Sequence, residues 1–205
     1  VQLISEKLKP RDEQDETRQM LDVIDTELTR VNGVLESFRD FASVSQLTKT
    51  TVPLQQLVER QLKFNAHTAA AQGVSVSAEL GSAPIAIAID EAKIEQVFLN
   101  LLVNALEAMP DGGTLTVRLK ESDNCVAIEV QDTGHGVPES LRSRIFDPYF
   151  TTKSKGTGMG LALSEKILRQ HGGTLNYRPL PVGSIFELTL PRSADLPNDC
   201  DRPKI

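Results

Sequence analysis

Hydrophobic positions between residues 12 and 44 recur at alternating steps of three and four, the heptad spacing of a helix with one apolar stripe. The stripe consists of Leu21, Ile24, Leu28, Val31, Leu35, Phe38 and Ala42. Residues 1–8 and the turn after them are too short to cover it as an antiparallel partner. We therefore expect residues 1–46 to form a helical hairpin that dimerises as a four-helix bundle. The alternative is a long helix packed on the chain's own globular domain.

Beyond a polar linker over residues 47–52, helical and alternating patterns follow one another. Helical periodicity predicts helices over residues 53–72, 90–109 and 159–170, the second of them capped by Asp90. Alternation predicts strands over residues 74–78, 85–89, 114–120, 126–131, 174–178 and 184–190. This order predicts an α+β fold over residues 53–192, a two-layer α/β sandwich with a mixed sheet and helices on one face. We expect residues 193–205 to be a disordered tail.

The composition is that of a soluble globular protein, with 40% hydrophobic and 24% charged residues. The net charge of −6 argues against nucleic acid as the main partner, because phosphate binding needs clustered lysine and arginine. No apolar run approaches the roughly 18 residues of a membrane span. Cys125 and Cys200 lack metal-binding spacing, and we expect unpaired thiols in a reducing compartment. We expect a cytoplasmic piece of a longer protein, one that can carry a membrane anchor elsewhere.

Two amides stand out on the helix predicted after Asp90. Asn100 and Asn104 are four residues apart and therefore share one face of a helix that is otherwise apolar nearly all round. Buried amides need hydrogen-bond partners, and neighbouring backbone can supply them. Since other polar sites follow in the chain, we favour a bound ligand or a hydrated Mg²⁺, which prefers oxygen ligands shared with phosphates.

A second polar site follows the strand predicted to end near Gln131. Asp132 comes directly after it, and Gly134 and Gly136 follow. A carboxylate at a strand end, beside glycines that let a ligand lie close, is suited to accept a hydrogen bond from an exocyclic amine. The alternative is a tight turn in which aspartate is the turn-forming residue.

The third site is a glycine-rich stretch after Lys153. Gly156, Gly158 and Gly160 fit neither the phosphate loop G-x-x-x-x-G-K-[ST] nor the dinucleotide fingerprint G-x-G-x-x-G. A hydrophobic cluster is expected just before it, made of Ile145, Phe146, Tyr149 and Phe150. The helix starting near Met159 would aim its free amide groups at an anion. The pattern predicts a loop that carries Lys153 to a phosphate and moves on its glycines.

Four motifs, in this order, carry a family resemblance. They are N-L-L-V-N-A over residues 100–105, D-T-G-H-G over 132–136, F-D-P-Y-F-T-T-K over 146–153 and G-T-G-M-G-L over 156–161. They resemble the N box, first glycine box, F box and second glycine box of two-component sensor histidine kinases, members of the GHKL superfamily with gyrase and MutL. The resemblance covers about residues 53–191, and its phrasing is closest to the nitrogen-regulation and PAS-linked subgroup. The hairpin resembles their dimerisation and phosphotransfer domain.

The resemblance implies roles for individual residues. Asn104 would coordinate Mg²⁺, Asn100 would lie beside the phosphates of ATP, and Asp132 would bind the adenine amine with Gly134 and Gly136 beside the base. The ATP lid would consist of Lys153, Gly156, Thr157, Gly158, Met159, Gly160 and Leu161. Asn100 and Lys153 would be the catalytic residues.

The resemblance also implies a kinase. The ATP hydrolases of the superfamily carry a water-activating glutamate four residues before the metal-binding asparagine, and here that position is Asn100, which cannot act as a general base. A kinase of this type passes the γ-phosphoryl group of ATP to a histidine and then to an aspartate of a response-regulator receiver domain. The implied partners are a second copy of the chain and that receiver domain.

The sequence departs from the family at two places. The phosphoacceptor phrase H-E-x-x-N-P is absent, since the three histidines are His67, His135 and His171. The opening VQLISEKL resembles the end of the helix that carries the acceptor, so we expect this chain to bind ATP without phosphorylating itself. Glu107 stands where many relatives carry a lysine. The alternatives are an ATP hydrolase, a non-enzymatic signalling module and a serine kinase of the anti-sigma type, which usually lacks such a hairpin.

Overall fold

The structure, a computed structural model, describes residues 46–122, 124–153 and 156–192, together with positions 20, 21, 24, 28 and 39. Of the predicted apolar stripe, Leu21, Ile24 and Leu28 are helical and expose their side chains. The other residues of the stripe, most of the predicted hairpin and the predicted tail over residues 193–205 lie outside the described residues. The hairpin and its dimer therefore stay predictions.

Five strands form one mixed sheet with the spatial order β2-β4-β5-β7-β6. In this order they are Val74–Glu79, Gly113–Glu121, Cys125–Asp132, Ser184–Pro191 and Thr174–Pro179. The β2 and β4 strands run parallel, and the other neighbouring pairs are antiparallel. The sequence placed all five strands to within one residue at either end, because their apolar residues alternate with polar ones.

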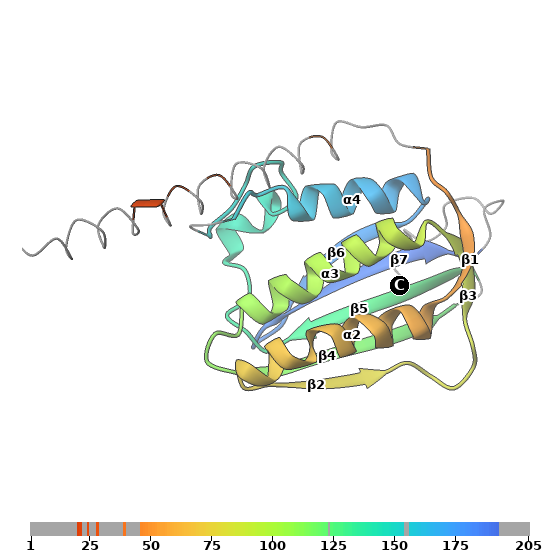
Figure 1. The fold of residues 1–205 in the computed structure, drawn as a ribbon, viewed down its shortest axis with the longest axis horizontal. Coiled ribbons are helices and arrows are strands. Elements are labelled where there is room, and N and C mark those ends of the chain that lie inside the picture. The colour runs from red at the N-terminus through yellow and green to blue at the C-terminus, as the bar shows by residue number, and fades with distance from the viewer. Residues whose placement is uncertain are drawn as a thin grey trace, which may run out of the picture.

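Three helices cover one face of this sheet (Figure 1). They are α2 Leu54–Ala71, α3 Glu91–Glu107 and α4 Gly160–Gln170, and together they confirm the predicted two-layer arrangement. A short 3-10 helix, Glu139–Arg144, was not predicted. The end of α2 is set by Gly73, whose φ of 69° lies in the left-handed region that stops a helix.

Helix α3 lies between the other two helices and is the central element of the helical layer. Its start is fixed by Asp90, whose side chain accepts a hydrogen bond from the backbone amide of Lys93, as predicted. Its buried residues are Ile94, Val97, Phe98, Leu101, Leu102, Ala105 and Leu106. Burying each of the larger side chains in this set contributes roughly 1.5–3 kcal/mol to the stability of the fold. The packing of α3 therefore anchors the domain.

A second, two-stranded sheet lies where the chain enters the domain. The β1 strand, Thr50–Pro53, pairs antiparallel with β3, Ala86–Ile89. Sequence reasoning assigned the first residues of β1 to the polar linker, although the β-branched run Thr50-Thr51-Val52 is typical of strands. The backbone amide of Thr48 also donates to the carboxylate of Asp90 at 3.0 Å, so the entering segment is tied to the start of α3.

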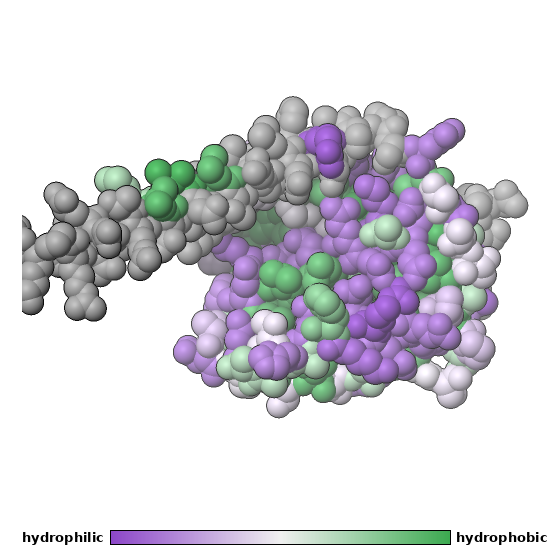
Figure 2. All heavy atoms as spheres, viewed as in Figure 1, coloured by the Kyte–Doolittle hydropathy of each residue, from purple (hydrophilic) through white to green (hydrophobic). Residues whose placement is uncertain are grey.

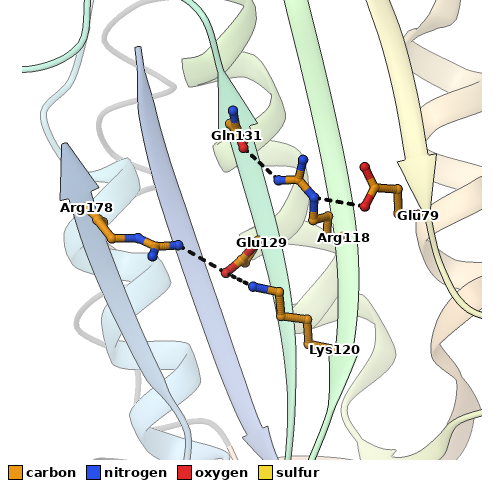
Figure 3. Close-up of polar contacts among 6 residues, drawn as sticks. All are labelled: Glu79, Arg118, Lys120, Glu129, Gln131 and Arg178. Atoms are coloured by element: carbon orange, nitrogen blue, oxygen red, sulfur yellow. Dashed lines mark hydrogen bonds and ion pairs between the residues drawn. The ribbon is translucent and has the colours of Figure 1, made fainter. Parts of the chain in front are cut away.

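The face of the main sheet opposite the helices carries a polar network (Figure 3). Arg118 on β4 donates to Glu79 on β2 at 3.0 Å and to Gln131 on β5 at 2.6 Å. Lys120 at 2.5 Å and Arg178 at 3.2 Å both donate to Glu129, whose side chain is only 2% exposed. Cross-strand pairs of this kind stabilise a sheet, and the two cations compensate for burial of the Glu129 charge.

The helical face is mostly polar, with hydrophobic side chains gathered over part of it (Figure 2). Exposed apolar residues on α2 and α3 include Phe64, Leu99 and Val103. Within the described residues, none of the helices combines the length and the apolar character needed to cross a bilayer. Cys125 is disulfide-bonded, so the prediction of an unpaired thiol is wrong there, and Cys200 lies outside the described residues.

His171 joins the end of α4 to the start of α3. Its ring is buried, and its Nε2 atom accepts a hydrogen bond from the backbone amide of Asp90 at 3.0 Å. The Nδ1 atom must then carry the proton, and it donates to the carbonyl of Ile167 at 2.8 Å. Burial away from water lowers the pKa of His171 below 6.5, and the positive charge of Lys49 acts in the same direction.

The lowered pKa of His171 makes the stability of the domain depend on pH. The unfolded chain takes up a proton on this residue near pH 6.5, whereas the folded chain resists it until a lower pH. The contribution of neutral His171 to the free energy of unfolding should therefore be fully present above about pH 6.5. It should fall as the pH drops from there toward the folded-state pKa. Each pK unit of difference is worth about 1.4 kcal/mol. Urea titrations at several pH values measure this slope.

The variant His171→Gln should be less stable at neutral pH and should show a shallower loss of stability on acidification. His67, which is exposed on α2, provides the matched control. The variant His67→Gln should keep the acid slope of the parent chain. An unchanged slope in His171→Gln would contradict the prediction.

Candidate functional site

Asn100 connects α3 to the start of α4. Its Nδ2 amide donates to the hydroxyl of Ser164 at 3.0 Å, and Ser164 is almost fully buried. A Cβ atom placed on Gly160 would lie 2.3 Å from the Oδ1 atom of Asn100, so a side chain at this position would displace the Asn100 amide. The partner that the amide was predicted to need is thus a serine on a neighbouring helix.

Asn104 and Glu107 lie next along the same face of α3 and both contact Lys153. The Nζ atom of Lys153 donates to Oδ1 of Asn104 at 2.6 Å and forms an ion pair with the carboxylate of Glu107. Residues three and four apart on a helix are neighbours on its surface, which is why both oxygens reach one ammonium group. The structure thus brings Lys153 to Asn104 and Glu107, while its predicted role at a phosphate stays a prediction.

Asp132 is the last residue of β5 and is only 2% exposed. One carboxylate oxygen accepts from the backbone amide of Gly134 at 2.8 Å, and the other accepts from the hydroxyl of Ser184 on β7 at 2.7 Å. These bonds fix the plane of the carboxylate. An ionised carboxylate offers about four lone-pair sites, so both oxygens keep capacity for a further donor.

The turn after Asp132 is packed against the end of α3. A Cβ atom on Gly134 would lie 2.3 Å from the carbonyl oxygen of Ala108, and the backbone amide of His135 donates to that oxygen at 3.2 Å. Gly136 has a φ of 64° and lies against Gly183. The sequence predicted that these glycines let a ligand lie close. At Gly134 the close neighbour in the structure is the chain's own backbone at Ala108.

The glycine-rich stretch packs against the segment before it. A Cβ atom on Gly158 would lie 2.4 Å from the carbonyl carbon of Tyr149, and one on Gly156 would lie 2.6 Å from Oγ1 of Thr151. Tyr149 itself has a φ of 66°, the one positive value for a non-glycine among the described residues. Its side chain is 57% exposed, so the predicted hydrophobic cluster does not include it.

The rest of that cluster and the start of α4 follow the prediction. Ile145 is buried, Phe146 and Phe150 pack on the core, and the guanidinium group of Arg144 lies 4.5 Å from the centre of the Phe150 ring. Met159 is buried at the start of α4 without a side-chain cap, and Leu161 packs on the core. The hydroxyl of Thr157 accepts from the Met159 amide at 3.3 Å.

A protein-only metal cage is not found within the described part of the chain, where no group of three or more acidic, histidine or cysteine side chains converges. The oxygens of Asn104 and Glu107 do converge on one positive charge, the ammonium group of Lys153. Two oxygen donors without a full cage suit Mg²⁺, which takes its remaining ligands from water and phosphates. This donor set fits the predicted metal.

A cavity of about 220 Å³ lies on another side of the Asp132 turn. It is bordered by the turn residues Gly134 to Val137 and by the β6–β7 loop, including Gly183. None of Asn100, Asn104 and Lys153 lines it. This cavity is therefore separate from the asparagine and lysine contacts on α3.

Sequence reasoning missed three residues that shape the site. Ser164 and Ser184 hold Asn100 and Asp132, and a Cβ atom on Gly183 would lie 1.9 Å from the backbone oxygen of Asp132. The serines have no local signal, because each lies more than fifty residues from its partner. Gly183 carries the ordinary signal of a hairpin turn between two predicted strands.

These contacts define an α+β domain in which three polar segments meet a fourth, which lies on helix α3. A protein-family model described as "Histidine kinase-, DNA gyrase B-, and HSP90-like ATPase" matches residues 89–194, which include all of them. The chain belongs to this family. The resemblance inferred from the four motifs is thereby confirmed at the family level.

Two relatives of this chain are named as kinases. Sporulation kinase A of Bacillus subtilis (strain 168) is 32% identical over 180 residues, 83% of this chain and 28% of that protein. The signal transduction histidine-protein kinase AtoS of Escherichia coli (strain K12) is 36% identical over 177 residues, 85% of this chain and 29% of AtoS. The chain thus spans less than a third of the length of either relative.

A solved structure adds the fold. Full-length ShkA in complex with AMPPNP superposes with a TM-score of 0.75 and 26% identity, over 89% of this chain and 40% of ShkA. The catalytic domain of the histidine kinase ThkA superposes with a TM-score of 0.67 and 28% identity, over 70% of this chain and 95% of that domain. The predicted α+β fold is therefore that of a histidine kinase catalytic domain.

Replacing Gly183 by alanine tests how tightly the turn backs Asp132. Gly183 has a φ of 80° and no room for a Cβ atom, whereas Gly81 has a φ of 70° and nothing within 4 Å. Gly81→Ala should cost only the left-handed backbone penalty of about 1–2 kcal/mol. Gly183→Ala should lose at least about 2 kcal/mol more in the free energy of unfolding, measured by urea titration, because the turn must move. Equal losses in the two variants would contradict the close approach.

Proposed function

We propose that this chain is the ATP-binding catalytic region of a two-component sensor histidine kinase. It binds ATP and transfers the γ-phosphoryl group to a histidine, from which a response-regulator aspartate receives it. The observation that carries the proposal is the set of contacts along α3, where Asn100, Asn104, Glu107 and Ala108 meet all the other motifs. Membership of the ATPase family, the kinase relatives and the AMPPNP complex of ShkA support it.

Asp132 is proposed to recognise the adenine. Its buried carboxylate is held by one backbone amide and one hydroxyl and still accepts a further hydrogen bond, which the exocyclic amine of adenine can donate. Gly134 and Gly136 would lie beside the base. The Asp132 carboxylate should favour adenine, whose exocyclic amine donates to it, over bases that carry a carbonyl at the position of that amine and would leave the buried acceptor without a donor.

Asn104 is proposed to hold Mg²⁺ through its Oδ1 atom, the atom that now accepts from Lys153. When bound, the ion would supply neutralisation of the phosphate charge. Asn100 keeps Gly160 and the start of α4 in place beside the phosphates. The free amides at the start of α4, around Gly160 and Leu161, would face the same anion.

Lys153 is proposed to bind the phosphates and to stabilise the charge that develops on the transferred group. With Gly156, Thr157, Gly158 and Met159 it would form the lid over the nucleotide. Phosphoryl transfer needs little covalent chemistry from the protein, so positioning and charge neutralisation carry most of the catalysis.

Transfer to a protein histidine is favoured over hydrolysis because Asn100 stands where a water-activating base is needed. Its amide has no basic atom and donates to Ser164. None of the chain's three histidines stands in the acceptor phrase H-E-x-x-N-P, and His171 is in addition buried and hydrogen-bonded through both nitrogens. We propose that the acceptor histidine lies on another polypeptide segment.

The domain arrangement is part of the proposal. Residues 1–46 would form the dimerising hairpin, residues 47–52 the connection, residues 53–192 the catalytic domain and residues 193–205 a tail. The partners would be a second copy of the chain and a receiver domain, in the cytoplasm.

Removing the adenine acceptor should abolish nucleotide binding. Isothermal titration of Mg²⁺ and an ATP analogue should show binding to the parent chain and a loss of at least about 100-fold in Asp132→Asn, whose amide presents a donor toward the amine. The matched control is Glu129→Gln, a buried carboxylate three residues earlier on the opposite face of the sheet. It should bind the analogue like the parent, and a folded parent chain that binds no analogue would refute the proposal.

The transfer step has its own test. A separate protein that carries a histidine-kinase acceptor helix should become labelled when it is mixed with this chain and γ-labelled ATP, while this chain itself stays unlabelled. Steady release of inorganic phosphate without labelling would instead identify an ATP hydrolase.

A further inference from the structure

The ammonium group of Lys153 lies between two oxygens of α3. One is Oδ1 of Asn104, at 2.6 Å, and the other belongs to the carboxylate of Glu107. These two residues occupy adjacent turns on the same face of the helix, so the two oxygens form a small cation-binding pair. The side chains of Lys153 and Glu107 are 44% and 50% exposed, which leaves the pair open to solvent and to a ligand.

An ordinary exposed ion pair would involve Lys153 and Glu107 alone. Here the same ammonium also takes the oxygen of Asn104, the proposed metal ligand. The Oδ1 atom of Asn104 cannot bind the ammonium group of Lys153 and a metal ion at the same time, because the two cations would repel each other at contact distance. Lys153 must therefore leave Asn104 before a metal ion can take its place.

Glu107 has a second effect on the same site. Its carboxylate brings a negative charge to within one turn of Asn104, where the triphosphate of a nucleotide would lie. A metal-free nucleotide would meet this repulsion and would also have to remove Lys153 from Glu107. A nucleotide that arrives with a divalent cation brings a replacement for the ammonium.

We propose that Glu107 is a positioning residue for cation exchange: it holds Lys153 on Asn104 in the free chain and receives the divalent cation, directly or through water, when the metal–nucleotide complex binds. The ammonium group of Lys153 then moves from Asn104 and Glu107 to the phosphates. The inference rests on the proposed nucleotide site and adds a residue and a selectivity to it, for metal-bound over metal-free nucleotide.

The contact itself is tested without nucleotide. Trypsin must bind the extended side chain of a lysine, so the ion pair should protect the bond after Lys153 in the full chain. Glu107→Gln should raise the rate of cleavage after Lys153, followed by mass spectrometry, by about two- to five-fold, the factor expected from losing an exposed pair. The control is Glu165→Gln, which removes another exposed ion pair, with Arg169 on α4. Equal rates in the parent chain and in Glu107→Gln would overturn the proposal.

The exchange is tested by the effect of Mg²⁺ on affinity. The ratio of the Kd for an ATP analogue in EDTA to the Kd in Mg²⁺ should be about two- to five-fold smaller in Glu107→Gln than in the parent chain, because metal-free nucleotide binds the variant more tightly. Glu165→Gln should keep the parent ratio. An unchanged ratio in Glu107→Gln, with binding intact, would overturn the exchange but leave the proposed function standing. A parent chain that binds no analogue would overturn both, while the cleavage assay would still report on the contact.

Discussion

One stripe of helix α3 organises the whole site. Asn100, Asn104, Glu107 and Ala108 follow one another along this stripe and share a face. They contact three other segments of the chain: Asn100 meets α4, Asn104 and Glu107 both meet Lys153, and Ala108 meets the turn after Asp132. The opposite side of α3 is buried in the core, which fixes the rotation of the helix about its axis. Because the rotation is fixed, the four contacts are fixed together, and the polar segments cannot shift independently.

Glycine serves this arrangement mainly as a residue without a side chain. At Gly134, Gly158 and Gly160 an added Cβ atom would meet Ala108, Tyr149 and Asn100 at distances well below contact. The motif glycines thus let backbone segments of this chain approach one another, and the site is assembled by that approach. If the glycine-rich loop moves when nucleotide binds, it must exchange these contacts for others. The loop would then switch between two defined arrangements rather than move freely.

The two faces of the sheet divide the work of the domain. The helix-covered face supplies the core and ends at Asp132, while the other face carries the cross-strand network around Glu129 (Figure 3). Because side chains alternate along β5, Glu129 belongs to the polar face of the sheet while Asp132, three residues later, is buried on the helix-covered face. The network keeps neighbouring strands in register, and the register places Ser184 opposite Asp132.

The sequence by itself determined the elements and the identity of the chemical groups. Periodicity is a local property, so the strands, the three helices and the Asp90 cap could be predicted from it, and four ordered motifs identified the family. Only the tertiary structure decided which groups meet. Ser164 on Asn100, Ser184 on Asp132 and Glu107 on Lys153 are contacts between segments far apart in the chain, set by strand order and helix rotation. The strand order leaves no periodic trace in the sequence. The β-branched run of β1 was assigned to the linker, because only its pairing with β3 makes it a strand.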